Sequence, residues 1–186
     1  ELVSSMRLGS RNPREVRDAS DLGRFGLGLK SASFAQCRNL TVASRTAEHP
    51  IAIRRWDLDY VESTGEWRLL YHPDPSAFEL IEPIKDMNHG TIVLWQRMDR
   101  IIGNQSSDDE RARRRFLQLV SDVESHLAMI FHRLLRPRGL QIHVNQNLVA
   151  PWDPFVLDSP ATQQLGEEVL PFEGAAVHIY PFVVPH

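Results

Sequence analysis

The stretch Asp21-Leu22-Gly23-Arg24-Phe25-Gly26-Leu27-Gly28-Leu29-Lys30-Ser31-Ala32-Ser33 holds three glycines within six positions, followed by a lysine and two serines. Glycine lets a backbone turn with positive φ and approach a ligand without a Cβ in the way. The residues after Gly28 have a helical pattern, and a helix N-terminus presents free N–H groups and a partial positive charge. The stretch therefore predicts an anion-binding turn, with phosphate as the natural ligand.

Three common phosphate-binding loops do not fit this stretch. Gly23 and Gly28 have the glycine spacing of a P-loop, but Leu29 intrudes before Lys30. The dinucleotide fingerprint requires a third glycine at Ser31 and a preceding strand, whereas the residues before Gly23 are polar. The kinase glycine loop joins two strands, and here a helix follows. Taken alone, the stretch is equally compatible with a glycine-rich turn that precedes an ordinary helix and binds nothing.

The full string from Gly23 to Ser33 resembles the second glycine box of the GHKL ATPases, and its pattern is most similar to the chaperone, MutL and MORC-like branch. The resemblance implies that the box ends an ATP lid and that its backbone amides surround the β- and γ-phosphates. The polar segment 10–21 would then be the lid. The nucleotide contacts that the resemblance implies are Ser10, Gly23, Arg24, Phe25, Gly26, Leu27, Gly28 and Lys30.

The run His89-Gly90-Thr91-Ile92-Val93-Leu94-Trp95 is the second informative stretch. By itself it predicts only the start of a β-strand, because β-branched residues follow a glycine. In GHKL proteins a Gly-Thr strand lies downstream of the glycine box, and its threonine supports recognition of the adenine amino group together with an aspartate. The resemblance therefore assigns an adenine-binding role to Thr91.

The composition is that of an ordinary globular protein: 186 residues, 42% hydrophobic, 24% charged and a net charge of −3, so bulk attraction to nucleic acid is not expected. The single cysteine, Cys37, excludes an internal disulfide and is expected to be a buried packing residue. No Cys/His spacing suggests zinc. No apolar run is long enough to span a membrane and no signal peptide is present, which predicts a cytoplasmic location without membrane partners.

The hydrophobic pattern predicts an α+β fold. The GHKL resemblance implies that residues 1–105 form the C-terminal portion of a Bergerat α/β sandwich, a mixed sheet with helices on one face. Residues 106–186 are expected to form a long helix and the start of a transducer-like domain, because the run 139–155 resembles the beginning of the transducer domain in MutL-, chaperone- and MORC-like proteins. The expected helices are 1–8, 27–36 (packed by Leu29, Phe34 and Ala35) and a long amphipathic helix from the capping box 107–110 to Pro137. The expected strands are 40–45, 51–56, 66–71, 78–84, 91–95, 140–144, 148–149 and 177–184, with 51–56 and 66–71 paired as a hairpin.

The GHKL resemblance also implies two motifs that would precede Glu1: a helix whose Glu activates water and whose Asn holds Mg²⁺, and an Asp-x-Gly-x-Gly turn that binds adenine. Neither occurs in these residues. The chain is therefore expected to be a fragment that carries no catalytic residue or metal ligand and does not hydrolyse ATP unaided, because phosphoryl transfer to water needs both.

For the parent protein, the resemblance implies an ATPase that uses ATP and Mg²⁺ and acts as a nucleotide-driven conformational switch, with a possible homodimer. Its client, protein or nucleic acid, is not identified by the sequence. The alternative is a non-catalytic, degenerate GHKL-like interaction module in which the glycine box is only a tight turn. A third possibility is an unrelated α+β protein.

Overall fold

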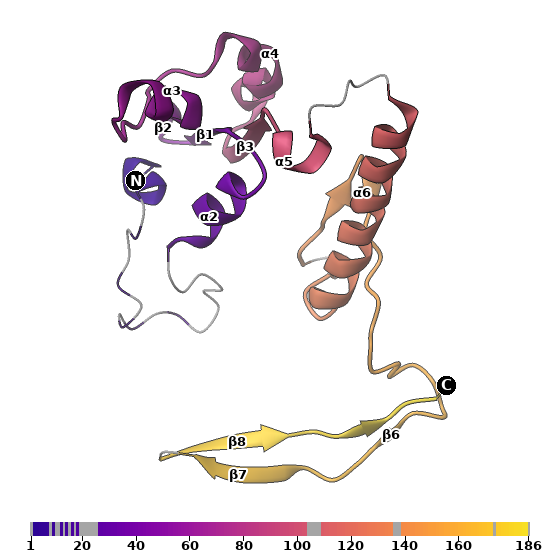
Figure 1. The fold of residues 1–186 in the computed structure, drawn as a ribbon. Coiled ribbons are helices and arrows are strands. Elements are labelled where there is room, and N and C mark those ends of the chain that lie inside the picture. The colour runs from indigo at the N-terminus through magenta and orange to yellow at the C-terminus, as the bar shows by residue number, and fades with distance from the viewer. Residues whose placement is uncertain are drawn as a thin grey trace. The chain divides into compact units, whose positions relative to one another are not determined.

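The structure, a computed structural model, describes residues 2–7, 9, 12, 14, 16, 18, 26–103, 109–135, 139–172 and 174–185. The chain divides into two compact units, Glu1–Asp109 and Glu110–His186 (Figure 1). Helices and antiparallel strands occur in both, which confirms the α+β class. The functional boundary at residue 105 stays a prediction. None of the helices in the described part of the chain is long and apolar enough to cross a membrane.

The first unit is built on a three-stranded antiparallel sheet, with the order β2-β1-β3. Its strands are β1 (Asn39–Thr46), β2 (His49–Asp57) and β3 (Gly90–Gln96). In the register, Leu40 of the central strand lies opposite Trp56 on one side and Trp95 on the other. Successive side chains of a strand point to opposite faces, so these three residues share a face of the sheet. The strands expected at 40–45, 51–56 and 91–95 are confirmed.

One face of the sheet is covered by α1 (Leu2–Met6) and α2 (Gly28–Phe34), and we call it the α1/α2 face. Its core cluster consists of Met6, Cys37, Leu40, Val42 and Trp56, with Phe34 packed against it. Cys37 is buried and free, as predicted.

The helix expected at 27–36 is confirmed, but its predicted packing is partly wrong. Leu29 is 42% exposed and Ala35 is exposed, whereas Lys30 and Ser33 are buried. Residues three and four apart share a helix face, so the side that faces the sheet runs through Lys30, Ser33 and Phe34. The inward position of a lysine is what the hydrophobic pattern does not reveal.

The opposite face of the sheet packs against short helical segments. These are η1 (Pro75–Ala77), α4 (Phe78–Ile81) and η2 (Glu82–Asp86), whose Ile81 and Ile84 join Ala43 in a second core cluster. The strand predicted at 78–84 is therefore wrong. Asp74 caps this segment by accepting hydrogen bonds from Ser76, and Pro75 occupies the first position, both of which favour a helical start.

The hairpin predicted from 51–56 and 66–71 is also wrong. Residues 58–64 form α3 (Leu58–Thr64), because the Asp57 side chain accepts hydrogen bonds from the Asp59 and Tyr60 amides and Gly65 ends the helix at φ +70°. Within 66–71, Leu70 alone forms a β-bridge, with Arg55. The true hairpin partner of β2 is β1. A short helix, α5 (Asp99–Ile102), follows β3.

The second unit contains the expected long helix, α6 (Glu110–Ile130), and a small hairpin of β4 (His143–Val144) and β5 (Asn147–Leu148). The strands predicted at 140–144 and 148–149 correspond to this hairpin. Ala128, Leu135 and Val149 form the core cluster of the unit. The long helix and the hairpin therefore pack around a common apolar centre.

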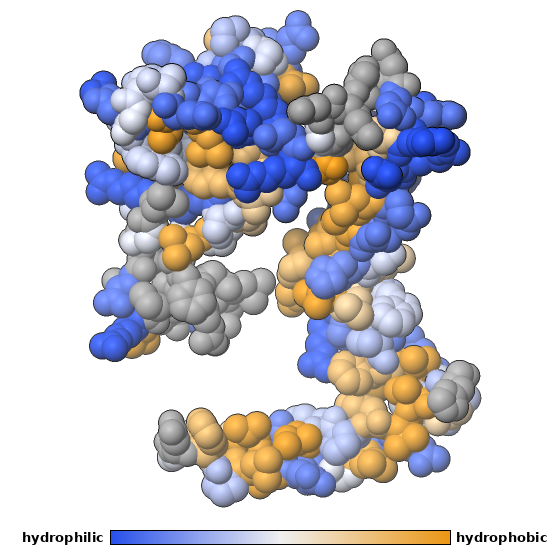
Figure 2. Space-filling model, viewed as in Figure 1, coloured by the Kyte–Doolittle hydropathy of each residue, from blue (hydrophilic) through white to orange (hydrophobic). Residues whose placement is uncertain are grey.

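The remaining strands are β6 (Gln163–Gln164), β7 (Glu168–Phe172), β8 (Ala175–Ile179) and β9 (Phe182–Val183). The strand predicted at 177–184 is divided between β8 and β9. Every described residue of β7 and β8 is exposed, including Leu170 and Val177. Figure 2 accordingly shows hydrophobic side chains at the surface of this hairpin and along α6, where Leu117, Val123 and Ile130 are exposed.

Candidate functional site

The glycine turn leads into α2. Gly26 has φ +63°, a left-handed conformation that favours glycine, as the sequence predicts for an anion-binding turn. Leu27 follows, with its side chain 43% exposed, and its carbonyl oxygen accepts hydrogen bonds from the Ser31 amide and hydroxyl. Gly28 begins α2, and a Cβ added there would meet no described atom within 4 Å apart from its chain neighbours and the backbone of α2 itself. Ser10, Gly23, Arg24 and Phe25 lie outside the described residues.

Lys30 lies under the helix rather than on its outer side. Lys30 is only 3% exposed, and its Nζ donates a 2.8 Å hydrogen bond to the backbone carbonyl of Ser5. Burial lowers the pKa of Lys30 from its ordinary value, because desolvation penalises the charged form. The ammonium group therefore has a protein partner at the end of α1.

A second polar contact joins α2 to the sheet. The indole Nε1 of Trp95 donates a 2.8 Å hydrogen bond to the hydroxyl of Ser33, which is fully buried. The Ser33 hydroxyl in turn donates to the Leu29 carbonyl at 2.6 Å. This chain of hydrogen bonds fixes the helix that carries the glycine turn to β3, the strand that carries Thr91.

Thr91 lies near the start of β3. Its hydroxyl is 2.9 Å from the Ser44 hydroxyl on β1, directly across the register. Thr91 is exposed, and a hydroxyl group can donate one hydrogen bond and accept two, so the pair retains capacity for a further polar partner. Its neighbours on the same side of β3, Val93 and Trp95, are 44% and 36% exposed.

The structure therefore brings the described members of the predicted site to one face of one sheet. Gly28 and Lys30 belong to α2, which covers the α1/α2 face and follows the turn at Gly26, and Thr91 belongs to the same face of β3. The surface offers backbone amides at a turn, a pair of hydroxyls and an accessible apolar strip. Among the described residues, no group of three or more His, Cys, Asp and Glu side chains is placed to hold a metal.

Sequence reasoning missed the roles of Trp95 and Ser33. The period of two along β3 places Trp95 on the same side as Thr91, and Ser33 is the last residue of the glycine box string. The sequence therefore indicates where both residues lie, but no rule of periodicity predicts a hydrogen bond between an indole and a hydroxyl 62 residues away in the chain.

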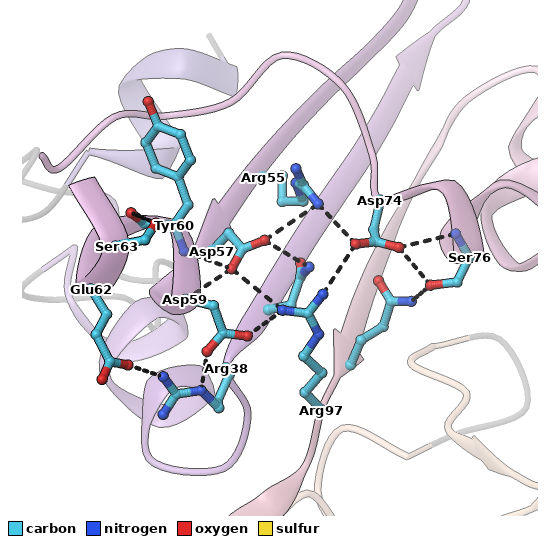
Figure 3. A network of polar contacts seen from close by, with 12 residues as sticks. Arg38, Arg55, Asp57, Asp59, Tyr60, Glu62, Ser63, Asp74, Ser76 and Arg97 are labelled. Atoms are coloured by element: carbon cyan, nitrogen blue, oxygen red, sulfur yellow. Dashed lines mark hydrogen bonds and ion pairs between the residues drawn. The ribbon is translucent and has the colours of Figure 1, made fainter.

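A separate polar network lies on the opposite face of the sheet (Figure 3). It joins Arg38, Arg55 and Arg97 to Asp57, Asp59, Glu62 and Asp74. Each of these charged groups has at least one partner of opposite charge. The network connects the end of the sheet to α3 and η1, and it offers no unpaired charge to a ligand.

The carboxylates of this network are stabilised in their charged form. Partial desolvation raises the pKa of Asp59, but hydrogen bonds from Arg38 and Arg97 outweigh it and hold that pKa below its ordinary value. Hydrogen bonds from the hydroxyl and amide of Ser76 lower the pKa of Asp74, with Arg55 and Arg97 adding to the effect. Both groups therefore strengthen the fold at neutral pH.

Comparison with known proteins gives one finding for the first unit. Residues 1–91 match the family described as histidine kinase-, DNA gyrase B-, and HSP90-like ATPase. The match includes the glycine turn, β1, β2 and the beginning of β3 as far as Thr91, whereas Trp95 and the second unit lie outside it. Neither the curated proteins nor the solved structures contain a match to the chain.

Proposed function

Because residues 1–91 belong to the GHKL superfamily of ATPases, we propose that the α1/α2 face of the sheet contributes part of an ATP site. In this proposal the glycine turn lies against the phosphates and Thr91 supports adenine binding. The observation that supports it is that α2, which follows the glycine turn, is joined by the Trp95–Ser33 hydrogen bond to β3, the strand whose Thr91 lies on the same face of the sheet.

The residues present fit a phosphate group. The positive φ of Gly26 turns the backbone just before α2, and no described side chain lies within 4 Å of the place where a Cβ of Gly28 would be, so a ligand could approach the main chain there. When bound, ATP would supply the free energy of phosphate release, and Mg²⁺ would neutralise phosphate charge. The contacts of Ser10, Gly23, Arg24 and Phe25 with the nucleotide stay predictions.

We further propose that this chain does not hydrolyse ATP by itself, because the water-activating Glu and the Mg²⁺-binding Asn of the family are not found in its sequence. Nucleotide binding would bias a conformational equilibrium, couple to the transducer-like region 106–186 and favour a homodimer. Cytoplasmic location belongs to the same proposal, and the client stays unassigned.

The alternative function is a non-catalytic, GHKL-like interaction module. One observation favours it: the Lys30 ammonium, which the family resemblance directs to phosphate, already has the Ser5 carbonyl as its partner. Under this alternative the glycine turn only reverses the chain, and no nucleotide binds to the α1/α2 face.

A titration followed by amide NMR separates the two functions. A non-hydrolysable ATP analogue with Mg²⁺ is added to the chain and to Gly28→Ala. The new methyl group enters an ordinary helical position and, outside α2 and its chain neighbours, meets no described atom within 4 Å. Gly166→Ala is the matched control, because a Cβ there is equally unopposed.

We expect saturable shifts at Gly26, Gly28 and Thr91 with a dissociation constant of about 1 mM or tighter, which corresponds to roughly −4 kcal/mol. Gly28→Ala should weaken binding while both variants keep their stability. Absence of saturable shifts, or equal binding by Gly28→Ala, would contradict the ATP site.

A further inference from the structure

We propose that Lys30 is a positioning residue: by donating to the Ser5 carbonyl, it fixes the end of α1 to the start of α2 and so sets the place of the glycine turn. Its role is thus not contact with phosphate. The proposal rests on the proposed function only in treating the glycine turn as part of a nucleotide site; the link between the helices is independent of it.

The first step concerns the environment of Lys30. A buried ammonium is costly unless it is hydrogen-bonded, and the Ser5 carbonyl at 2.8 Å is the partner that the structure gives it. Ser5 lies in the last turn of α1, where carbonyl groups have no hydrogen-bond partner within the helix, and its carbonyl accepts from Lys30. The contact satisfies one group from each helix.

The second step concerns α1. A five-residue helix is not stable by itself, since helix formation has a costly nucleus. The Met6 side chain is 1% exposed in the core cluster, and its carbonyl accepts a 2.9 Å hydrogen bond from the Trp56 indole on β2. Two donors from elsewhere in the fold, Trp56 and Lys30, therefore hold adjacent carbonyls at the end of α1.

The third step concerns α2. Trp95 on β3 fixes Ser33, one turn beyond Lys30, so α2 is also attached to the sheet. Lys30 thus connects two helices that are each anchored to the sheet by a tryptophan indole. Gly26 and Gly28 lie within four residues of Lys30, and any movement of α2 relative to α1 would displace them.

Lys30 and Lys85 are the only lysines of the sequence, which gives a matched pair for the test. Lys85 is a surface residue paired with Glu82. Lys30→Met keeps an unbranched side chain, one heavy atom shorter, and removes the donor. Lys30→Arg retains a donor, and Lys85→Met is the control. The measurement is hydrogen exchange of the α1 amides and of the Trp56 indole proton in the whole chain.

We expect Lys30→Met to accelerate both exchange rates by roughly tenfold, the factor that corresponds to losing one hydrogen bond from a charged group. Lys30→Arg should restore part of the protection, and Lys85→Met should leave it unchanged. Unchanged exchange in Lys30→Met would overturn the proposal. Circular dichroism shows whether the variants fold. If Lys30→Met is unfolded, Lys30→Arg decides: exchange of its α1 amides as fast as in the unfolded Lys30→Met chain would overturn the proposal.

A second arm distinguishes positioning from phosphate binding. The wild-type chain with ¹³C-labelled lysine gives one signal from Lys30 and one from Lys85, and the ATP analogue or adenosine is added to it. We expect neither ligand to displace the Lys30 signal, and Lys30→Met to weaken both ligands by a similar factor. A Lys30 signal that moves with the ATP analogue alone would overturn the proposal. If no ligand binds, the proposed function fails, while the exchange experiment still decides the role of Lys30.

Discussion

The two faces of the β2-β1-β3 sheet are attached to their covering segments by different chemistry. On the α1/α2 face, single hydrogen bonds from Trp56, Trp95 and Lys30 reach helix atoms above a small apolar cluster. On the opposite face, three arginines and four acidic residues form a closed network beside a cluster of isoleucines (Figure 3).

The difference indicates that one face supports the fold and the other is available to a ligand. The opposite face satisfies its charges internally and therefore holds α3 and η1 in place. The α1/α2 face leaves Thr91, Val93 and Trp95 accessible next to a turn that needs glycine at position 26. A face with accessible polar groups and few anchoring contacts is suited to a ligand, whereas a closed ionic network is suited to support.

The largest effect is expected from Asp57→Ala on the supporting face. Asp57 is 7% exposed, caps α3, and pairs with Arg55 and Arg97. Its removal takes the cap from α3 and one carboxylate from each arginine, while Asp74 still pairs with both. We expect a loss of about 2–3 kcal/mol in the free energy of unfolding, the sum of a lost helix cap and a lost charge-assisted hydrogen bond, measured by urea denaturation.

The matched control for Asp57→Ala is Glu62→Gln, which removes an exposed member of the same network and should cost less than about 1 kcal/mol. Equal effects of the two substitutions would contradict the distinction between the buried centre of the network and its rim.

A smaller effect is expected from Trp95→Phe on the α1/α2 face. The substitution keeps an aromatic ring and removes the donor to Ser33, which should reduce stability by about 1 kcal/mol. Affinity for the ATP analogue should fall roughly fivefold, the same free energy expressed as binding. Trp152→Phe, at a 56% exposed position in the second unit, should change neither quantity. An unaltered affinity of Trp95→Phe for the ATP analogue would show that the Trp95–Ser33 hydrogen bond does not contribute to nucleotide binding.

The smallest effect is expected from acid. The pKa values of Asp59 and Asp74 are lower in the folded state than in the unfolded chain, so their contribution is fully present above about pH 4 and is lost as the pH falls through their folded values. Urea denaturation at pH 7 and pH 3 should show this loss. Arg97→Gln should reduce the difference in the free energy of unfolding between pH 7 and pH 3. An unchanged difference would show that Arg97 does not cause the pH dependence.

The sequence predicted the central parts of the first unit because they follow simple periods. The β-branched runs of β1 and β3 and the glycine turn before α2 have patterns that local physics explains. The sequence of segment 78–84 favours a strand as much as a helix because its apolar residues are compatible with both periods, and the helical start depends on Asp74 and Pro75.

The parts of the site that could not be predicted are the long-range contacts. Lys30 in a sequence looks like a solvent-exposed or phosphate-binding cation, and nothing near it indicates that Ser5, 25 residues earlier, accepts its hydrogen bond. Likewise, β7 and β8 have the apolar alternation of buried strands, but burial requires a second layer, and in the described structure their residues are exposed.

The central claim is that nucleotide binds to the α1/α2 face, and ¹⁹F NMR of the chain labelled with fluorotryptophan tests it most directly. Two of the four tryptophans report on the two units separately. Trp95 lies on that face four residues after Thr91, and Trp152 lies in the second unit. Addition of the ATP analogue with Mg²⁺ is predicted to shift the Trp95 signal saturably and to leave the Trp152 signal in place. No shift of Trp95 up to about 10 mM analogue, roughly tenfold above the weakest binding expected, would contradict the account.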